Sequence, residues 1–201
     1  MSEKTHADPT ALGLFGLAIV TLAASTQKLG ITSGLAYVIP WAIFLGGFAQ
    51  LMAGMLDYKK GNVFGATAFC GYGLFWLGMA TSWLINTGAL GEILKQNVDI
   101  NQMGFVFIGY LIFTIFLTIG SLSASKVLFF IFVFIDLLFI ELAISTLVKT
   151  DTVHVFFAKM AGISELIISL LSFYACGANI LYNHYGKEII PIGKPFILKN
   201  Q

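Results

Sequence analysis

Long apolar runs alternate with short polar breaks along this chain. Most runs approach or exceed the roughly 17–25 residues that an α-helix needs to cross the hydrocarbon core of a bilayer. The breaks carry Gly, Asn, Asp, Lys and Ser, residues that are typical of loops. The pattern therefore predicts six membrane-spanning helices, over residues 12–29, 34–56, 63–85, 103–122, 127–148 and 156–181.

The longest break, residues 86–102, contains a short amphipathic segment at 90–94 that we expect to lie along the membrane interface. The sequence has no strong internal repeat and no basic N-terminal region followed by a cleavage site, so we expect the first apolar run to be retained. The prediction is an all-α polytopic membrane protein, a six-transmembrane-helix bundle that forms one domain over residues 1–201.

Composition agrees with a surface that faces lipid. Hydrophobic residues make up 58% of the chain and charged residues 10%, against about 45–50% and about 25% in soluble domains. The net charge is +1 and the basic residues do not cluster, so we expect no nucleic-acid partner.

The predicted loops divide the lysines unevenly between the two membrane faces. Because cytoplasmic loops carry the excess of positive residues, the richer face is assigned to the cytoplasm. We therefore expect an integral protein of a prokaryotic plasma membrane with both termini in the cytoplasm. The richer face holds Lys4, Lys59, Lys60, Lys126, Lys187, Lys194 and Lys199, and the other face holds Lys28, Lys95, Lys149 and Lys159.

Small and polar residues form a stripe in the second run. Gly46, Gln50 and Gly54 recur at helical spacing, with Gly47 and Ala53 beside them. Such a stripe favours close helix contact in lipid. A carboxamide at membrane depth must also find partners, so Gln50 either joins helices or lines a polar route.

Aromatic residues share one face of the third run. Phe69, Tyr72 and Trp76 stand at i, i+3 and i+7, a pattern more typical of packing than of a gate. Tyr72 lies well inside the run, away from the interface where Tyr is usually found. Its hydroxyl therefore needs a buried partner or a water-filled cavity.

Three acids interrupt the last two runs and are candidates for handling protons: Asp136, Glu141 and Glu165. Acids at this depth tend to face a bundle interior and to mark ion or proton routes, but they also join helices. Asp136 and Glu141 are five residues apart, about 140° around a helix, so they cannot both face one narrow pore. Glu165 is close enough to the start of its run to reach toward the interface.

Fixed positive charge is missing at mid-membrane, because every cation is a lysine in a loop or at the end of a run. An anion would have to travel on hydroxyl and amide donors, or cross as its neutral acid. Thr21 with Ser25, and Thr114 with Thr118, are spaced to supply donors, although such hydroxyls commonly bond their own i−4 carbonyl.

Motifs of catalysis are not found. The chain has no metal-binding His pair, no nucleophile elbow and no P-loop, and His6, His154 and His184 lack ligand spacing. We expect no enzyme activity, no catalytic residue, no metal and no cofactor.

Several segments, in order and spacing over nearly the whole chain, resemble the acetate uptake transporter family, also called succinate–acetate permeases. The segments are Asp8-Pro9-Thr10-Ala11-Leu12-Gly13-Leu14, Gly46-Gly47 with Gln50, Ala53 and Gly54, Tyr58-Lys59-Lys60-Gly61-Asn62, Thr67-Ala68-Phe69 with Tyr72-Gly73 and Phe75-Trp76, and Pro191-Ile192-Gly193.

The resemblance implies a homohexamer of six-span protomers, each with its own narrow route for acetate and, in some members, succinate. It also implies channel-like or proton-coupled transport and a three-residue constriction, which falls here at Leu17, Tyr72 and Ile135. Leu17 replaces a family Phe. The candidates for contact with substrate are Gln50, Thr21, Asp8, Leu12 and Trp76.

Asp8 stands where the family signature has Asn, and would disfavour a passing anion unless it is protonated or paired. The leading hypothesis is transport of small monocarboxylates, with acetate, protons and membrane lipid as partners. The alternatives are transport of ammonia or another small neutral solute, and a membrane sensor that does not transport.

Overall fold

The computed structural model describes residues 7–198. The regular elements among these residues are helices, and no strand occurs among them. Lys4, His6 and Lys199 lie outside the described residues. The elements are α1 (Thr10–Lys28), α2 (Val38–Trp41), the π-helix η1 (Ala42–Ala49), α3 (Gln50–Lys59), α4 (Val63–Asn86), α5 (Glu92–Gln96), α6 (Ile100–Ser121), α7 (Lys126–Leu147) and α8 (Asp151–Tyr185).

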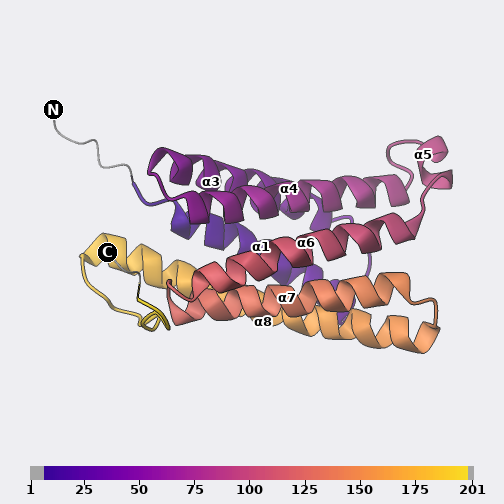
Figure 1. Cartoon of the computed structure of the whole chain (residues 1–201). Helices are drawn as coiled ribbons and strands as arrows, with labels where there is room; N and C mark the ends of the chain where they lie inside the picture. Colours follow the sequence, from indigo (N-terminus) through magenta and orange to yellow (C-terminus); the bar gives the residue numbers. More distant parts are fainter. Residues whose placement is uncertain (1–6, 199–201) are drawn as a thin grey trace.

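Six of these helical stretches are long and apolar enough to cross a membrane, which confirms the predicted all-α architecture. The spans pack in a ring: α1 lies between η1 and α8, α7 lies between α8 and α6, and α4 lies against α3, η1 and α6. Figure 1 shows the long helices running nearly side by side, with α5 at the end of the bundle away from both termini.

Several predicted boundaries differ from those of the structure. The second span begins at Val38 rather than at residue 34, because Gly34 has a φ of +78° that interrupts a right-handed helix. The sixth span runs from Asp151 to Tyr185 rather than over 156–181. Its 35 residues extend roughly 52 Å at 1.5 Å per residue, so α8 exceeds the hydrocarbon core. The short helix of the long loop covers Glu92–Gln96 rather than 90–94.

The second span is divided by the π-helix η1, which leads directly into Gln50. π-Helical turns are rare and occur often at functional sites. The small residues of this span form helix contacts, as the stripe predicted: Gly46 lies against Trp76 of α4, and Gly54 lies against Cys70 of α4.

Gly54 sets the approach of α3 to α4. A Cβ at this position would stand 2.9 Å from both the Ala66 carbonyl oxygen and the Cys70 backbone nitrogen. Backbone atoms cannot rotate away as side chains do, so the two helices would have to separate.

We expect Gly54→Ala to destabilise the protein by about 1–3 kcal/mol, the cost of overpacking a well-packed interior. The matched control is Gly78→Ala in α4, where a Cβ meets nothing within 4 Å and the better helix former gains up to about 1 kcal/mol. Thermal unfolding of both purified variants measures the difference. Equal midpoints would contradict this account of the α3–α4 contact.

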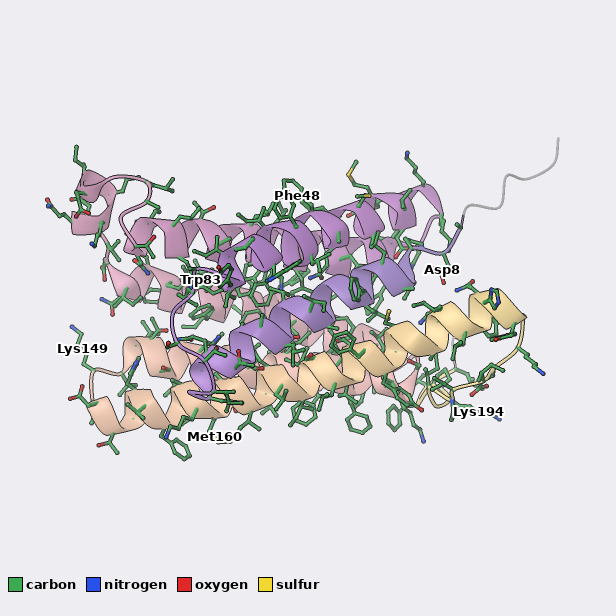
Figure 2. The ribbon with its side chains drawn as sticks, turned by 180° about the vertical axis from the view of Figure 1, so that it is seen from behind. Asp8, Phe48, Trp83, Lys149, Met160 and Lys194 are labelled. Carbon is green, nitrogen blue, oxygen red and sulfur yellow. The ribbon has the colours of Figure 1, made fainter. Side chains whose placement is uncertain are left out.

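The two ends of the described chain lie at the same end of the bundle (Figure 1), and Figure 2 shows Asp8 and Lys194 there, opposite Lys149. The segment after α8 folds back onto the α6–α7 loop. The Val127 backbone N–H donates to the Ile192 carbonyl (3.1 Å), and Phe196 N–H donates to the Leu122 carbonyl (3.0 Å).

Candidate functional site

A narrow cavity lies inside the bundle, between α1, α3, α4 and α7. Its volume is about 100 Å³, well above the roughly 10–15 Å³ that one water needs. The lining residues of α1, α4 and α7 come from the N-terminal half of each helix. These halves lie at the end of the bundle where the two ends of the chain are found (Figure 1), so the cavity lies at that end. It is lined by Thr10, Leu14, Leu17, Gln50, Asp57, Asn62, Phe64, Gly65, Ala68, Phe69, Tyr72, Leu128, Ile131, Phe132 and Ile135.

The three residues predicted to form a constriction meet at the inner part of this cavity. Leu17, Tyr72 and Ile135 are all buried and come from the first, third and fifth spans. Farther along the bundle, the buried Phe75 packs edge-on against Trp76 (5.4 Å between ring centroids) and Phe139 (5.3 Å). The predicted constriction residues therefore stand where the cavity gives way to a packed aromatic core.

The Tyr72 hydroxyl has both a buried partner and a place on the cavity wall. It lies 2.9 Å from the Thr114 hydroxyl of α6, and that hydroxyl in turn lies 2.7 Å from the Tyr110 carbonyl. Because a carbonyl only accepts and Thr114 has one proton to donate, Tyr72 is the donor to Thr114. The Tyr72 oxygen thus has only acceptor capacity left for a solute.

Gln50 is fully buried on the cavity wall, at the start of α3. Neither its amide nitrogen nor its amide oxygen has a hydrogen-bond partner. Of the two interpretations of Gln50, the missing protein partner favours a polar group on a solute route over a residue that joins helices. A buried polar group without a partner costs about 1–3 kcal/mol, so Gln50 presents an unsatisfied donor and acceptor to the cavity.

Asp57 is a buried acid of the cavity that sequence reasoning missed. The residue is 1% exposed, no hydrogen bond of good geometry reaches its carboxylate oxygens, and the Asn62 amide is the polar group beside it. The apolar pattern placed the end of the second span at residue 56, so Asp57 was read as part of a loop. An acid one residue beyond a predicted span, followed by a Lys-Lys-Gly turn, was the available signal.

Asp8 lies outside this cavity, in a separate hollow with Asn179 and Glu188, and it is paired with Lys60 at 3.2 Å. Burial alone would raise the pKa of Asp8, but hydrogen bonds from Thr10 and the charge of Lys60 outweigh it and hold the pKa below the usual value. The ion pair is therefore intact above the ordinary carboxyl pKa and is lost as pH falls through the lowered one.

The other sequence candidates for substrate contact do not line the cavity. Leu12 is 36% exposed on the outside of α1. Thr21 donates to the Leu17 carbonyl at 2.7 Å within its own helix. Trp76 is buried against Gly46. Of the proposed contacts, Gln50 alone joins Leu17, Tyr72 and Ile135 on the cavity wall.

The three predicted proton-handling acids also lie away from the cavity wall. The Thr118 hydroxyl of α6 donates to Asp136 at 2.6 Å, which is an inter-helix contact. Glu141 is 8% exposed with one oxygen lacking a partner.

Glu165 reaches the end of α1, where both its oxygens accept from Lys28 at 3.0 Å, and it is only 2% exposed. Lys28 ends α1, so a lysine at a span end does offset a membrane acid.

A metal centre is not seen in the described part of the chain, where no three His, Cys, Asp or Glu side chains form a group that could hold an ion. The cavity wall is instead mainly aliphatic and aromatic, with the polar atoms of Thr10, Gln50, Asp57, Asn62 and Tyr72. A small solute with both an apolar part and a hydrogen-bonding group matches this wall.

Six spans around a narrow internal cavity define the class as a helical membrane channel or transporter. Residues 1–191 match the GPR1/FUN34/yaaH family, and the chain belongs to that family. The family resemblance drawn from the sequence is thereby confirmed.

Two relatives and one solved structure are closely similar. The succinate-acetate/proton symporter SatP of Escherichia coli K12 is 34% identical over 195 residues, 96% of this chain and 99% of that protein. Acetate permease A of Emericella nidulans is 30% identical over 202 residues, 96% of this chain and 67% of the permease. The structure of the bacterial acetate channel SatP matches with a TM-score of 0.84 at 33% identity, covering 94% of this chain and 100% of that one.

Proposed function

We propose that this protein transports acetate across a membrane. The observation that carries the proposal is the cavity: Leu17, Gln50, Tyr72 and Ile135 line an apolar space of about 100 Å³, in a chain whose fold matches an acetate channel over 94% of its length. An acetate methyl group suits the aliphatic wall, and Gln50 offers hydrogen bonds to its carboxyl group.

Similar proteins are named both a succinate-acetate/proton symporter and an acetate channel, so coupling to protons is part of the proposal. We further propose a homohexamer in the plasma membrane of a prokaryote, with both termini in the cytoplasm. The lysine distribution supports that orientation, and the shared position of the two termini fits an even number of spans. The chain is proposed to act as a single domain without enzyme activity.

The test is uptake of labelled acetate by proteoliposomes, with and without an inward proton gradient and with protein-free liposomes subtracted. We expect the protein to carry acetate. Succinate should compete with this acetate flux, and ammonium should leave the flux unchanged. Competition by ammonium would favour a neutral solute instead. A protein that moves neither solute would favour a membrane sensor.

We expect Tyr72→Ala to relax size selection, because it removes a buried ring from the predicted constriction. The rate of a larger carboxylate relative to acetate should rise on the order of tenfold, which corresponds to about 1.4 kcal/mol in the barrier. Tyr185→Ala, at the exposed end of α8, is the matched control. Unaltered selectivity in Tyr72→Ala would remove this residue from the constriction.

A further inference from the structure

The mouth of the cavity holds a carboxyl group that forms no ion pair. Asp57 stands in the last turn of α3, is 1% exposed, and receives no hydrogen bond of good geometry at either oxygen. Gly65 of α4 makes room for this carboxyl group, because a Cβ there would collide with both the Asp57 carboxylate and the Asn62 amide. Asp57 lines the cavity, so a buried acid without an ion-pair partner stands where a solute in the cavity can reach it.

Few charges surround this carboxyl group. α1 carries no titratable residue from Thr10 through Val20, and the cavity-facing residues of α7 are all apolar. α4 contributes the free thiol of Cys70. The charged groups that act on Asp57 are Asp8 and Lys60, which form an ion pair with each other at 3.2 Å. In this structure no basic side chain makes an ion pair with Asp57.

An ionised Asp57 would oppose the substrate of the proposed function. Two carboxylates in a cavity of about 100 Å³ repel strongly, since the apolar wall screens them poorly. Deeper in the cavity, Tyr72 has only acceptor capacity left. A single added proton turns the repulsion between the two carboxylates into attraction, because an O–H···O⁻ bond between two carboxyl groups is short and strong.

We propose that Asp57 is the residue that supplies a proton to the carboxylate substrate as it enters the cavity. A hydronium ion at the mouth gives its proton to Asp57 and becomes water, and the substrate carboxylate then accepts a hydrogen bond from the protonated Asp57. The O–H bond of Asp57 breaks as the O–H bond of the substrate acid forms. The neutral acid passes Leu17 and Ile135, and Asp57, again a carboxylate, takes its next proton from another hydronium ion at the mouth.

The proposal rests on the proposed function and assigns the proton step to Asp57 rather than to Asp136, Glu141 or Glu165. Those three acids do not line the cavity. Asp136 is already held by Thr118 and Glu165 by Lys28. Asp57 is the acid with both a wall position and two oxygens that no hydrogen bond of good geometry reaches.

The experiment measures proton uptake on acetate binding. Purified protein in weakly buffered detergent solution receives sodium [¹³C]acetate, while an indicator dye follows pH and infrared difference spectra follow protein carboxyl groups. We expect the wild type to take up a proton with each acetate bound, because binding that requires a protonated group is linked to proton uptake. Asp57→Asn keeps the size of the side chain but cannot ionise, so it should bind acetate with no proton uptake and no change in the protein carboxyl bands.

Two further variants distinguish the possible results of this experiment. Glu92→Gln removes an exposed acid in α5 and should behave as wild type, whereas Asp136→Asn tests the competing acid. Proton uptake that survives Asp57→Asn but disappears in Asp136→Asn would overturn the assignment to Asp57, as would acetate binding to wild type without proton uptake. An absence of acetate binding in the wild type would overturn the proposed function itself, and the proton step with it.

Discussion

Lys28→Met should be among the most destabilising single substitutions in this protein. Lys28 ends α1 and donates to both oxygens of Glu165 in α8, at 3.0 Å each. Removing the lysine leaves Glu165, 2% exposed, as a buried carboxyl group without its counter-charge. Breaking a buried ion pair from one side typically costs about 3–5 kcal/mol, and we expect a loss of that size.

The double variant Lys28→Met/Glu165→Leu isolates the cause. It removes both charges and fills the site with apolar atoms, a change that is often neutral or stabilising, so it should recover most of the lost stability. Lys95→Met is the control for losing a lysine, because Lys95 forms an exposed pair with Glu92 at 3.7 Å and such pairs contribute about 0–1 kcal/mol. Unfolding free energies of the three purified variants give the comparison. A Lys28→Met protein as stable as Lys95→Met would contradict the buried-pair account.

We expect Gln50→Met to raise the stability of the protein and to lower its acetate flux. The wild-type amide is fully buried with neither polar atom bonded, and such a group costs about 1–3 kcal/mol. Methionine has the same unbranched length, so it keeps the packing against Gly16 while removing the unsatisfied atoms. We expect the variant to gain stability by about that amount and to lose acetate flux, because the cavity wall loses its amide donor.

Thermal unfolding and proteoliposome uptake on the same preparation test the Gln50 prediction. Gln96→Met, at the exposed end of α5, controls for a surface Gln-to-Met exchange and should change neither quantity. If Gln50→Met lost stability, Gln50 would be joining helices through contacts of its own, as one interpretation of the sequence stripe suggested. If stability rose with flux unchanged, the amide would have no part in transport.

Both predictions concern buried polar groups, and the surroundings of each group determine how its removal changes the stability of the protein. At Lys28 the protein satisfies a buried charge, and removing the partner is therefore costly. At Gln50 the protein leaves a buried amide unsatisfied, and removing the group is therefore favourable to folding. An unsatisfied group retained on a cavity wall is expected where function requires it, since natural proteins accept local instability at such sites.

The apolar pattern by itself determined the class of this protein and the number of its spans. Length and hydropathy suffice for this, because a chain in lipid must satisfy its backbone within each helix. Tyr72 could be singled out in the same way, since a hydroxyl deep inside a span needs a partner or a cavity. The structure supplies both, with Thr114 at 2.9 Å and the cavity wall.

Only the tertiary structure decided which polar groups meet. Lys28 and Glu165 are 137 residues apart in the chain, so no local pattern relates them, and their contact exists because α1 packs along α8. Asp57 looked like a loop residue until the α3–α4 packing buried it beside the cavity. Periodicity reports which face of a helix is apolar, but the neighbour on that face, and hence whether a polar group is paired, follows from how the helices pack together.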